Sequence, residues 1–389
     1  MPTYPTYKLG ELAEILDSFR KPINSTERAK RIQGKSENEL YPYYGATGQV
    51  GLIDEYLIDG EYVLVGEDGA PCLEPFKNKS YIIKGKAWVN NHAHIILGKK
   101  GVACNQYLNY YLNSFDYKDY VNGTTRLKLT QGNLVEIPIP LPPLSTQHQI
   151  VSRIESLFAE LDKAVEHLRT AQQQLKIYRS AVLNHWLNNE DGKWETVKLG
   201  EVAEVKRGRS KHRPRNDKSL FGGKYPFIQT GEIREAKGGT ISTYSQTYSE
   251  KGLEQSRLWP KGTLCLTIAA NIAETAYLGF GACFPDSVVG IIARQDRLNL
   301  DYFNCYIQLI KQMIEQQASA TAQKNINVDY LDNLQIPLPP LPEQQRIVKE
   351  IEMRLSQAEA AEARIAEALQ KTEALRQSIL KKAFSGELV

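Results

Sequence analysis

The feature that most constrains the fold is a proline-rich phrase that occurs twice and each time precedes a helical pattern. IPLPPLSTQHQIVSRIE begins at Ile139, and IPLPPLPEQQRIVKEIE begins at Ile336, 197 residues further on. Proline cannot donate a backbone hydrogen bond and disfavours helix in the residue before it, so each helix is expected to begin only near Gln147 or Glu343. An ordinary proline-rich linker, or a ligand for an SH3-type groove, is the alternative. Repetition at one fixed position before a helix favours a rigid structural hinge.

Other segments repeat in the same order, which indicates two copies of one module. The spacing between partners drifts between 184 and about 202 residues before it settles at 197, as expected if the copies differ in their loops. Runs such as YVLVG, HIILG, LCLTIA and VVGIIA, bounded by Gly, Pro and Asp, predict strands, and helical stretches near the start and end complete a mixed α/β module. The paired segments include YKLGELAEI from Tyr7 and VKLGEVAEV from Val197, YPYYGATG from Tyr41 and YPFIQTG from Tyr225, and GEYVLVGEDGA from Gly60 and GTLCLTIAANI from Gly262.

After each proline phrase the apolar residues repeat every 3.5 positions, which is typical of a coiled-coil seam. In the first copy the spacing of 4 and 3 continues without a break for more than four heptads, while the second copy carries a looser stripe. The predicted seam consists of Ile150, Ile154, Leu157, Leu161, Leu168, Leu175 and Val182 in the first helix, and of Ile347, Ile351, Leu355, Ile365, Leu375 and Ile379 in the second.

A helix of roughly 40 residues is about 60 Å long. The first helix carries the chain away from the first module, and the second helix has its own apolar stripe to bury against it, so it is expected to run back. We therefore predict an α+β protein with similar globular modules at residues 1–144 and 189–341. Two long helices, at 145–188 and at the start of 342–389, would form an antiparallel coiled coil with an approximate two-fold relation. Such modules would suit half-sites separated by about one turn of a DNA duplex, ~34–36 Å.

Basic residues cluster in the corresponding segment of each module, although the net charge is only +3. Clustering matters more than the sum, because cations on one loop can bind phosphates and guanine edges. A solvated surface loop is the alternative, and packing or turn formation is the alternative for each uncharged candidate. The candidate DNA-binding residues are Arg20, Lys21, Arg28, Lys30, Arg31, Tyr43, Tyr44 and His92 in the first module, and Lys206, Arg207, Arg209, Lys211, Arg213, Arg215, Gln229, Thr230 and Asn271 in the second.

Motifs for chemistry are absent or misleading. AKRIQGKS, from Ala29, fits a relaxed Walker A pattern, but the polar segment before it cannot be the buried strand that a P-loop needs. His92 and His94 are two residues apart, yet no third ligand stands at metal spacing, so ordinary histidines are expected. No nuclease, methyltransferase or hydrolase motif is visible, which predicts a non-catalytic chain without a metal. Five cysteines without a Cys-x-x-Cys pair, and the absence of a signal peptide or an apolar run of about 18 residues, predict a reduced, soluble, cytoplasmic protein.

The doubled hinge, the two long helices, the LRQSILKKAFSGELV ending and the KLGELAE and KLGEVAE openings together resemble the specificity subunit of type I restriction-modification enzymes over the whole chain. The resemblance implies target recognition domains at Met1–Leu144 and Trp194–Leu341, each reading half of a bipartite DNA site. It implies helices at Ser145–Leu187 and Pro342–Phe384 that set the spacing and dock two methyltransferase subunits. One departure is VLNHWLNNEDGKWE at the end of the first helix, which lacks the AFSGEL ending of the second.

The resemblance further implies that S-adenosylmethionine, ATP and magnesium are used by the partner subunits, which methylate adenine N6 and, with restriction subunits, cleave DNA in host defence. The residues alone leave two other hypotheses open. One is a coiled-coil adaptor whose twin modules bind protein, and the other is a cryptic nuclease or methyltransferase. Salt-sensitive DNA affinity separates the first hypothesis from the adaptor, because phosphate contacts weaken steeply with salt.

Overall fold

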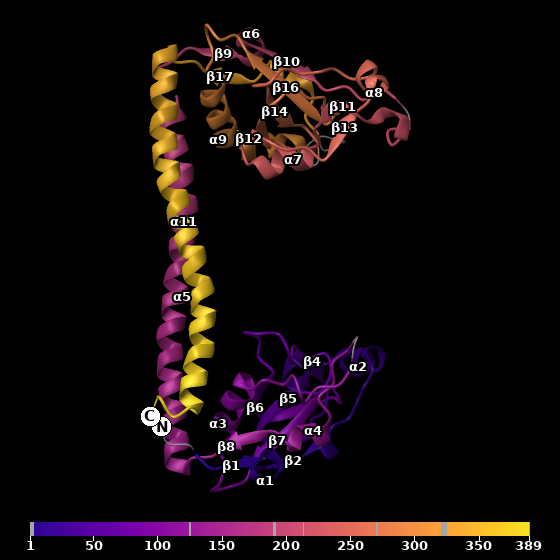
Figure 1. The fold of residues 1–389 in the computed structure, drawn as a ribbon, viewed down its shortest axis with the longest axis vertical. Coiled ribbons are helices and arrows are strands. Elements are labelled where there is room, and N and C mark those ends of the chain that lie inside the picture. The colour runs from indigo at the N-terminus through magenta and orange to yellow at the C-terminus, as the bar shows by residue number, and fades with distance from the viewer. Residues whose placement is uncertain are drawn as a thin grey trace. The chain divides into compact units, whose positions relative to one another are not determined.

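The computed structural model describes residues 4–123, 126–189, 192–212, 214–269, 271–319 and 325–388. The chain forms two compact units: unit 1 is Met1–Thr170 with Arg364–Val389, and unit 2 is Ala171–Ala363. Each unit therefore contains one module and part of each long helix, α5 (Leu144–Leu187) and α11 (Leu341–Phe384) (Figure 1). The sequence-based boundaries kept each helix whole, whereas the units divide both helices.

The module of unit 1 is built on a six-stranded sheet in the order β2-β7-β5-β6-β3-β4. Neighbouring strands are antiparallel except β3, which is parallel to β6. The strands of this sheet are β2 (Ala13–Ile15), β3 (Tyr41–Gly45), β4 (Gly48–Ile53), β5 (Ile58–Gly66), β6 (Ser80–Val89) and β7 (Ala93–Gly98). A separate antiparallel ladder joins β1 (Thr6–Lys8) to β8 (Pro138–Pro140). The helices are α1 (Leu9–Leu12), α2 (Ser25–Ile32), α3 (Asn105–Ser114) and α4 (Gln131–Val135), with 3-10 turns η1 (Asp17–Phe19) and η2 (Glu37–Glu39).

The module of unit 2 repeats this plan with a five-stranded sheet in the order β10-β16-β14-β15-β12, in which β12 is parallel to β15. Its strands are β10 (Ala203–Arg207), β12 (Thr240–Ile241), β14 (Leu264–Thr267), β15 (Thr275–Leu278) and β16 (Val288–Ala293). Two smaller ladders pair β11 (Phe221–Phe227) with β13 (Gln246–Tyr248) and β9 (Thr196–Lys198) with β17 (Gln335–Pro337). The helices are α6 (Leu199–Val202), α7 (Thr230–Ala236), α8 (Glu250–Glu254), α9 (Leu300–Ser319) and α10 (Val328–Asp332), with η3 (Lys218–Leu220).

The segments expected to be strands are the central strands of the two sheets, β5 and β7 in unit 1 and β14 and β16 in unit 2. Successive residues of a strand face opposite sides of the sheet. Val63 and Val65 accordingly pack with α3 in one apolar cluster, while Leu64 packs in another on the opposite face. In unit 2 Leu264 packs with α9 and Cys265 packs in a second cluster. Both faces of each sheet are covered, which explains why these runs are continuously apolar.

Each proline phrase is held to its module by tyrosines of the neighbouring helix. The Tyr107 hydroxyl of α3 donates to the Pro140 carbonyl, and the Tyr302 hydroxyl of α9 donates to the Pro337 carbonyl at 2.9 Å. A proline has a backbone carbonyl but no backbone N–H. The carbonyls of a proline-rich strand are therefore satisfied here by a donor from outside the strand. The same contact therefore occurs in both copies.

The glutamine that follows each phrase is buried, at 0% exposure for both Gln147 and Gln344. The side-chain carbonyl of Gln344 accepts from the Asn299 amide at 2.8 Å, and its amide group donates to the carbonyls of Arg297 and Pro339 at 2.9 and 2.8 Å. Gln147 makes the equivalent three bonds to the Cys104 amide and the carbonyls of Val102 and Pro142, at 2.9, 2.8 and 3.0 Å. One side chain thus joins the proline strand, the loop before α3 or α9 and the first turn of the long helix. The helices begin at Leu144 and Leu341, slightly earlier than expected: α5 begins directly after Pro143, and α11 carries Pro342 in its first turn, where proline is tolerated.

Within each unit the parts of α5 and α11 run in opposite directions. In unit 2 Trp186 lies under Arg346, 5.1 Å from ring to guanidinium, while Arg179, further back along α5, pairs with Glu359 and Glu362 at 3.0 and 3.2 Å. Residues of increasing number along α5 therefore contact residues of decreasing number along α11, which is the antiparallel arrangement that the sequence predicted. In unit 1 Ile150 and Ile154 share an apolar cluster with Leu380 and Ala383, and Asp162 pairs with Arg376.

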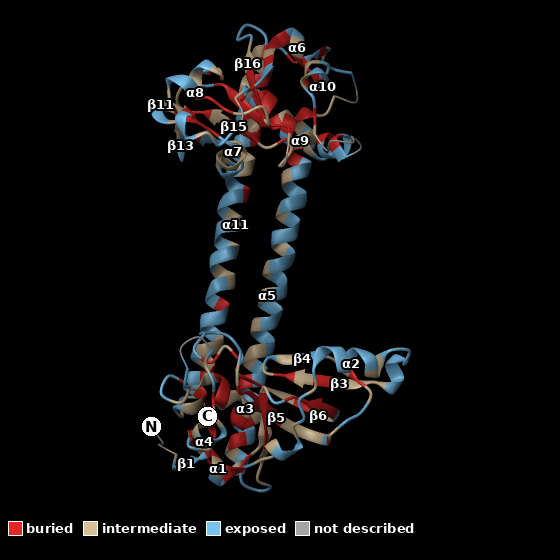
Figure 2. Cartoon of the chain, turned by 90° about the vertical axis from the view of Figure 1, so that its right-hand side faces the viewer, coloured by how far each residue is buried: buried red, intermediate tan, exposed pale blue. Residues whose placement is uncertain are grey.

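The predicted seam is most deeply buried where the helices meet the modules, and Figure 2 shows the middle of both helices largely exposed. Leu375 is a correction to the sequence-based seam, since it is 49% exposed. From the buried Thr372 the next inward position is four residues on, at Arg376, whose guanidinium lies 4.8 Å from the Phe158 ring. The other predicted seam residues are buried or half-buried: Ile150, Ile154, Leu157, Leu161, Leu168, Leu175, Val182, Ile347, Ile351, Leu355, Ile365 and Ile379.

Replacing Gln344 by Leu should lower the free energy of unfolding by at least about 2 kcal/mol, because an unpaired buried amide and two unpaired carbonyls each cost about 1–3 kcal/mol. The midpoint of urea unfolding measures this. Gln345→Leu is the matched control, since Gln345 is exposed and next in sequence. Equal midpoints for the two variants would contradict the role given to Gln344.

Replacing Leu380 by Ala should destabilise the protein by about 2–5 kcal/mol, because Leu380 is 4% exposed in the core of unit 1. Leu375→Ala should change stability by no more than about 0.5 kcal/mol, as for other exposed positions. Thermal unfolding of both variants checks the corrected seam. A larger loss for Leu375→Ala would restore the seam read from the sequence.

Candidate nucleic-acid interface

Arg20, predicted to be a DNA contact, forms ion pairs inside unit 1. Its side chain is 16% exposed and pairs with Asp17 at 2.9 Å and with Glu67. His94, 1% exposed, places Nδ1 2.6 Å from the Asp17 carboxylate and Nε2 2.8 Å from a backbone carbonyl. Burial by itself raises the pKa of Glu67, but hydrogen bonds from Arg20 and a lysine bring that pKa below its ordinary value. Arg20 therefore balances the carboxylates that hold η1 to β7.

The cations of α2 and of the turn that follows it are only partly available for an external ligand. Arg31, 25% exposed on its side chain, pairs with Asp54 at 2.6 Å and with Glu55 at 2.8 Å. Lys35 pairs with the other oxygen of Asp54 at 2.7 Å, and this hydrogen bond, with that of Arg31, lowers the pKa of Asp54. Lys30 is exposed on the same helix. Of the three, Lys30 has the least restricted charge.

Tyr43 is also a correction, because it is 3% exposed and its hydroxyl donates to the Ile23 carbonyl at 3.3 Å. Arg28 lies over the Tyr43 ring at 4.7 Å, so this pair packs together instead of facing solvent separately. Tyr44 is half-buried with its ring centroid 5.9 Å from that of Tyr81, and burial raises the pKa of Tyr44. These aromatic side chains pack against β3, the strand next to the edge strand β4.

The remaining candidates of unit 1 are Lys21 and His92. Lys21 is exposed, with its ammonium 5.6 Å from the Trp88 ring. His92, 39% exposed, places Nδ1 2.5 Å from Asp68, and the same carboxylate oxygen accepts from Arg126 at 2.9 Å. His92 precedes β7, so His92 and His94 do not share a strand face. Arg126 and Asp68 were missed in the sequence because no local motif brings these two distant positions together.

Unit 2 presents its basic segment differently, in a stretch that begins with the last two residues of β10 and ends with the first residue of η3 (hereafter the β10 loop, Lys206–Lys218). Arg209 and Lys211 are exposed and show no ion pair in the described part of the chain. Lys206 pairs with Glu204 at 2.8 Å but keeps 61% of its side chain exposed. Arg213 lies outside the described residues.

The β10 loop is fastened to the turn before β16 through Asp286. Arg207 donates to the Asp286 backbone carbonyl, and Arg215 pairs with its carboxylate at 2.6 Å. At the far end of the loop Asp217 caps η3, and hydrogen bonds from Ser219 and then from His212 lower the pKa of Asp217. Because these contacts hold the loop at both ends, its basic side chains extend from a backbone of fixed conformation.

The uncharged candidates of unit 2 lie near helix α7 and the β14–β15 turn. Gln229 is exposed, caps α7 and donates to the Gln246 side chain at 2.9 Å, and Thr230 is the first residue of α7. Asn271 is half-exposed, and its backbone carbonyl accepts from the Thr267 hydroxyl. The structure gives Gln229 a capping role without removing it from the surface.

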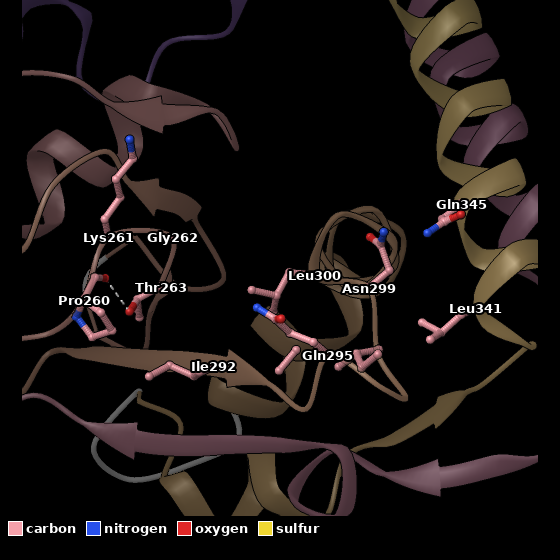
Figure 3. A pocket seen from close by; sticks show the side chains of 12 residues that line it. Pro260, Lys261, Gly262, Thr263, Ile292, Gln295, Asn299, Leu300, Leu341 and Gln345 are labelled. Atoms are coloured by element: carbon pink, nitrogen blue, oxygen red, sulfur yellow. Dashed lines mark hydrogen bonds between the residues drawn. The ribbon is translucent and has the colours of Figure 1, made fainter.

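The cavity in Figure 3 does not resemble an active site. It has a volume of about 460 Å³ and lies between the strand β16 region, the start of α9 and the start of α11. Lys261 is the only ionisable side chain among its lining residues, and the Thr263 hydroxyl is already bonded to the Pro260 carbonyl at 2.8 Å. A cavity without a paired acid, base or nucleophile offers no acid–base or covalent chemistry.

Among the described residues, no three His, Cys, Asp or Glu side chains converge as a metal site. The five cysteines are free thiols, and burial raises the pKa of Cys283 to about 11 and that of Cys305 to about 12, which makes these thiols poor nucleophiles. The described helices include none with the length and apolar composition that a membrane crossing requires.

Comparison with known proteins assigns the repeated fold to a class. The family model for the type I restriction modification DNA specificity domain matches residues 1–168 and 191–370, one match for each module. A protein of Haemophilus influenzae described as a type I restriction enzyme specificity subunit is 31% identical over 356 residues, which is 87% of this chain and 84% of that protein. The EcoDI specificity subunit of Escherichia coli is 24% identical over 422 residues and covers 99% of this chain and 88% of its own.

Two solved structures share the fold. The HsdS subunit of Thermoanaerobacter tengcongensis has a TM-score of 0.62 at 19% identity, covering 100% of this chain and 98% of its own. A chain from a structure of assembly and conformational transition in the type I R-M system has a TM-score of 0.76 at 20% identity, covering 100% and 99%. The fold of this chain is thus shared with an HsdS subunit and with a chain of a type I R-M system.

The chain belongs to the type I restriction modification DNA specificity family. Its relatives are named for specificity, the non-catalytic component of type I restriction enzymes.

Replacing Arg20 by Leu should destabilise the protein by about 3 kcal/mol, because it leaves the carboxylates of Asp17 and Glu67 poorly compensated in a mostly buried site. Thermal unfolding of the purified chain measures the loss. Lys30→Leu is the control on the exposed face of α2 and should have little effect. A stable Arg20→Leu protein would show that Arg20 is not structural and return it to the DNA-binding candidates.

Proposed function

We propose that this chain is the DNA sequence-recognition subunit of a type I restriction-modification complex and that each module reads one half of a bipartite duplex site. The observation that carries the proposal is the match of the specificity domain model to each of the two modules in turn. Exposed cations in the β10 loop and on α2 supply the charge for phosphate contacts. The bases recognised would be set by side chains of the same surfaces.

The proposed partners are two methyltransferase subunits and the restriction subunits of the same system. The two helices would dock the methyltransferase subunits and set the spacing between the half-sites. Apolar side chains exposed on these helices support a docking role, among them Ile177 at 69% and Met353 at 50% exposure. S-adenosylmethionine, ATP and magnesium would be used by the partners, which would methylate adenine N6 and cleave DNA in the cytoplasm.

Purification of the chain with the methyltransferase subunit of its system tests the proposal. The complex is expected to bind a duplex with a split site, to lose affinity steeply as salt is raised, and to methylate adenine, while the chain alone transfers no methyl group. Methylome sequencing of cells that carry the full system should show one bipartite motif. Failure to form the complex, or binding to protein without salt-sensitive affinity for DNA, would favour the adaptor hypothesis instead.

A further inference from the structure

The corresponding basic segments of the two modules hold their cations in different electrostatic states. In unit 1 the segment from Phe19 to Lys35 has three cations in ion pairs with carboxylates of its own module, and their side chains are 16%, 25% and 38% exposed. Those three are Arg20, Arg31 and Lys35. Lys21 and Arg28 of the same segment lie near aromatic rings, at 5.6 and 4.7 Å. Three of the six cations of this segment therefore pair with carboxylates of the module and two more lie over aromatic rings, which leaves Lys30 with neither kind of contact among the described residues.

The carboxylates that neutralise the first segment come from distant parts of unit 1. Glu67 follows β5, and Asp54 and Glu55 follow β4. Each lies on a strand end that the sheet brings beside the basic segment. A phosphate that approached Arg20 or Arg31 would have to displace a partner at hydrogen-bond distance and would meet the remaining negative charge.

In the β10 loop of unit 2 the cations remain more exposed than the ion-paired cations of the unit 1 segment. Its two cations with carboxylate partners, Lys206 and Arg215, remain 61% and 53% exposed. Arg209, Lys211 and Lys218 are exposed and show no ion pair within the described residues. Each of these three could therefore contact a phosphate without first breaking an internal ion pair.

The backbone of the β10 loop is also fixed before any ligand binds. Arg207 is bonded to the Asp286 carbonyl and Arg215 to its carboxylate, and a Cβ at Gly208 would lie 2.4 Å from the carbonyls of Phe284 and Pro285. The Ser256 hydroxyl donates to the Arg209 carbonyl at 2.9 Å. A preorganised loop loses less conformational freedom on binding, which favours affinity.

We infer that the two modules contribute unequally to the ionic part of DNA binding: the β10 loop of unit 2 supplies more of the phosphate contacts than the segment from Phe19 to Lys35 of unit 1. This inference rests on the proposed function and specifies how it is divided. The DNA half bound by unit 2 contributes most of the ionic affinity.

The test measures how the affinity of the complex with its methyltransferase subunits for a target duplex depends on salt. Each lost phosphate contact should reduce the slope of log K against log salt by about 0.9. The triple variant Arg209→Gln, Lys211→Gln, Lys218→Gln removes three such contacts and should therefore reduce the slope by about 3. The matched variant in unit 1, Lys21→Gln, Lys30→Gln, Lys35→Gln, removes the same charge and should reduce the slope by less, at most about 2, because Lys35 pairs with Asp54 and Lys21 lies over the Trp88 ring.

Three outcomes separate the inference from the function on which it rests. A larger fall for the unit 2 variant supports the inference. Equal falls, or a larger fall for the unit 1 variant, overturn the inference while leaving the proposed function standing. A wild-type complex without salt-dependent affinity for any duplex overturns both. Circular dichroism of the variants checks that all of the substituted positions, which are exposed, leave the fold intact.

Discussion

The architecture depends on a buried amide that fixes the direction in which each long helix leaves its module. Gln147 and Gln344 are wholly buried, and each satisfies one backbone N–H and two carbonyls from two separate segments, the loop before α3 or α9 and the proline strand. An unpaired polar group in this position would cost more than the hydrogen bond contributes, so the glutamine specifies one geometry. The proline strand cannot move relative to the helix without breaking these bonds.

The helices serve as the common framework for two modules whose surfaces differ. In unit 2 Val182, Leu183 and Leu187 enter the core, and in unit 1 Leu380 and Ala383 do so, so each module is completed by the far end of a helix. Each unit thus contains segments from both copies of the repeat. Each module consequently shares its hydrophobic core with segments of both long helices and is not a separate domain joined to them by a linker.

The surface loops are free to diverge because the framework does not depend on them. The first module uses its basic segment to bind its own carboxylates, whereas the second fastens a basic loop through Asp286 and leaves its cations exposed. The same sequence feature, a cluster of Lys and Arg, therefore has two physical roles in one chain. Only the carboxylates contributed by other strands distinguish them.

The sequence by itself determined the repeat, the central strands, the two long helices and most of the seam, because these depend on local periodicity and on the limits that proline places on the backbone. Leu375 was wrongly assigned to the seam, because the residue that follows Thr372 in a seam can lie either three or four positions further on. The contact with Phe158 selects the fourth position, Arg376. Tertiary structure alone decided which candidate contacts remain available. Arg20 and Tyr43 are occupied by Glu67 and the Ile23 carbonyl, partners 47 and 20 residues away in the chain. The sequence gives the charge and polarity of each side chain. Whether that side chain is exposed to solvent or bonded within the protein depends on residues that only folding brings together.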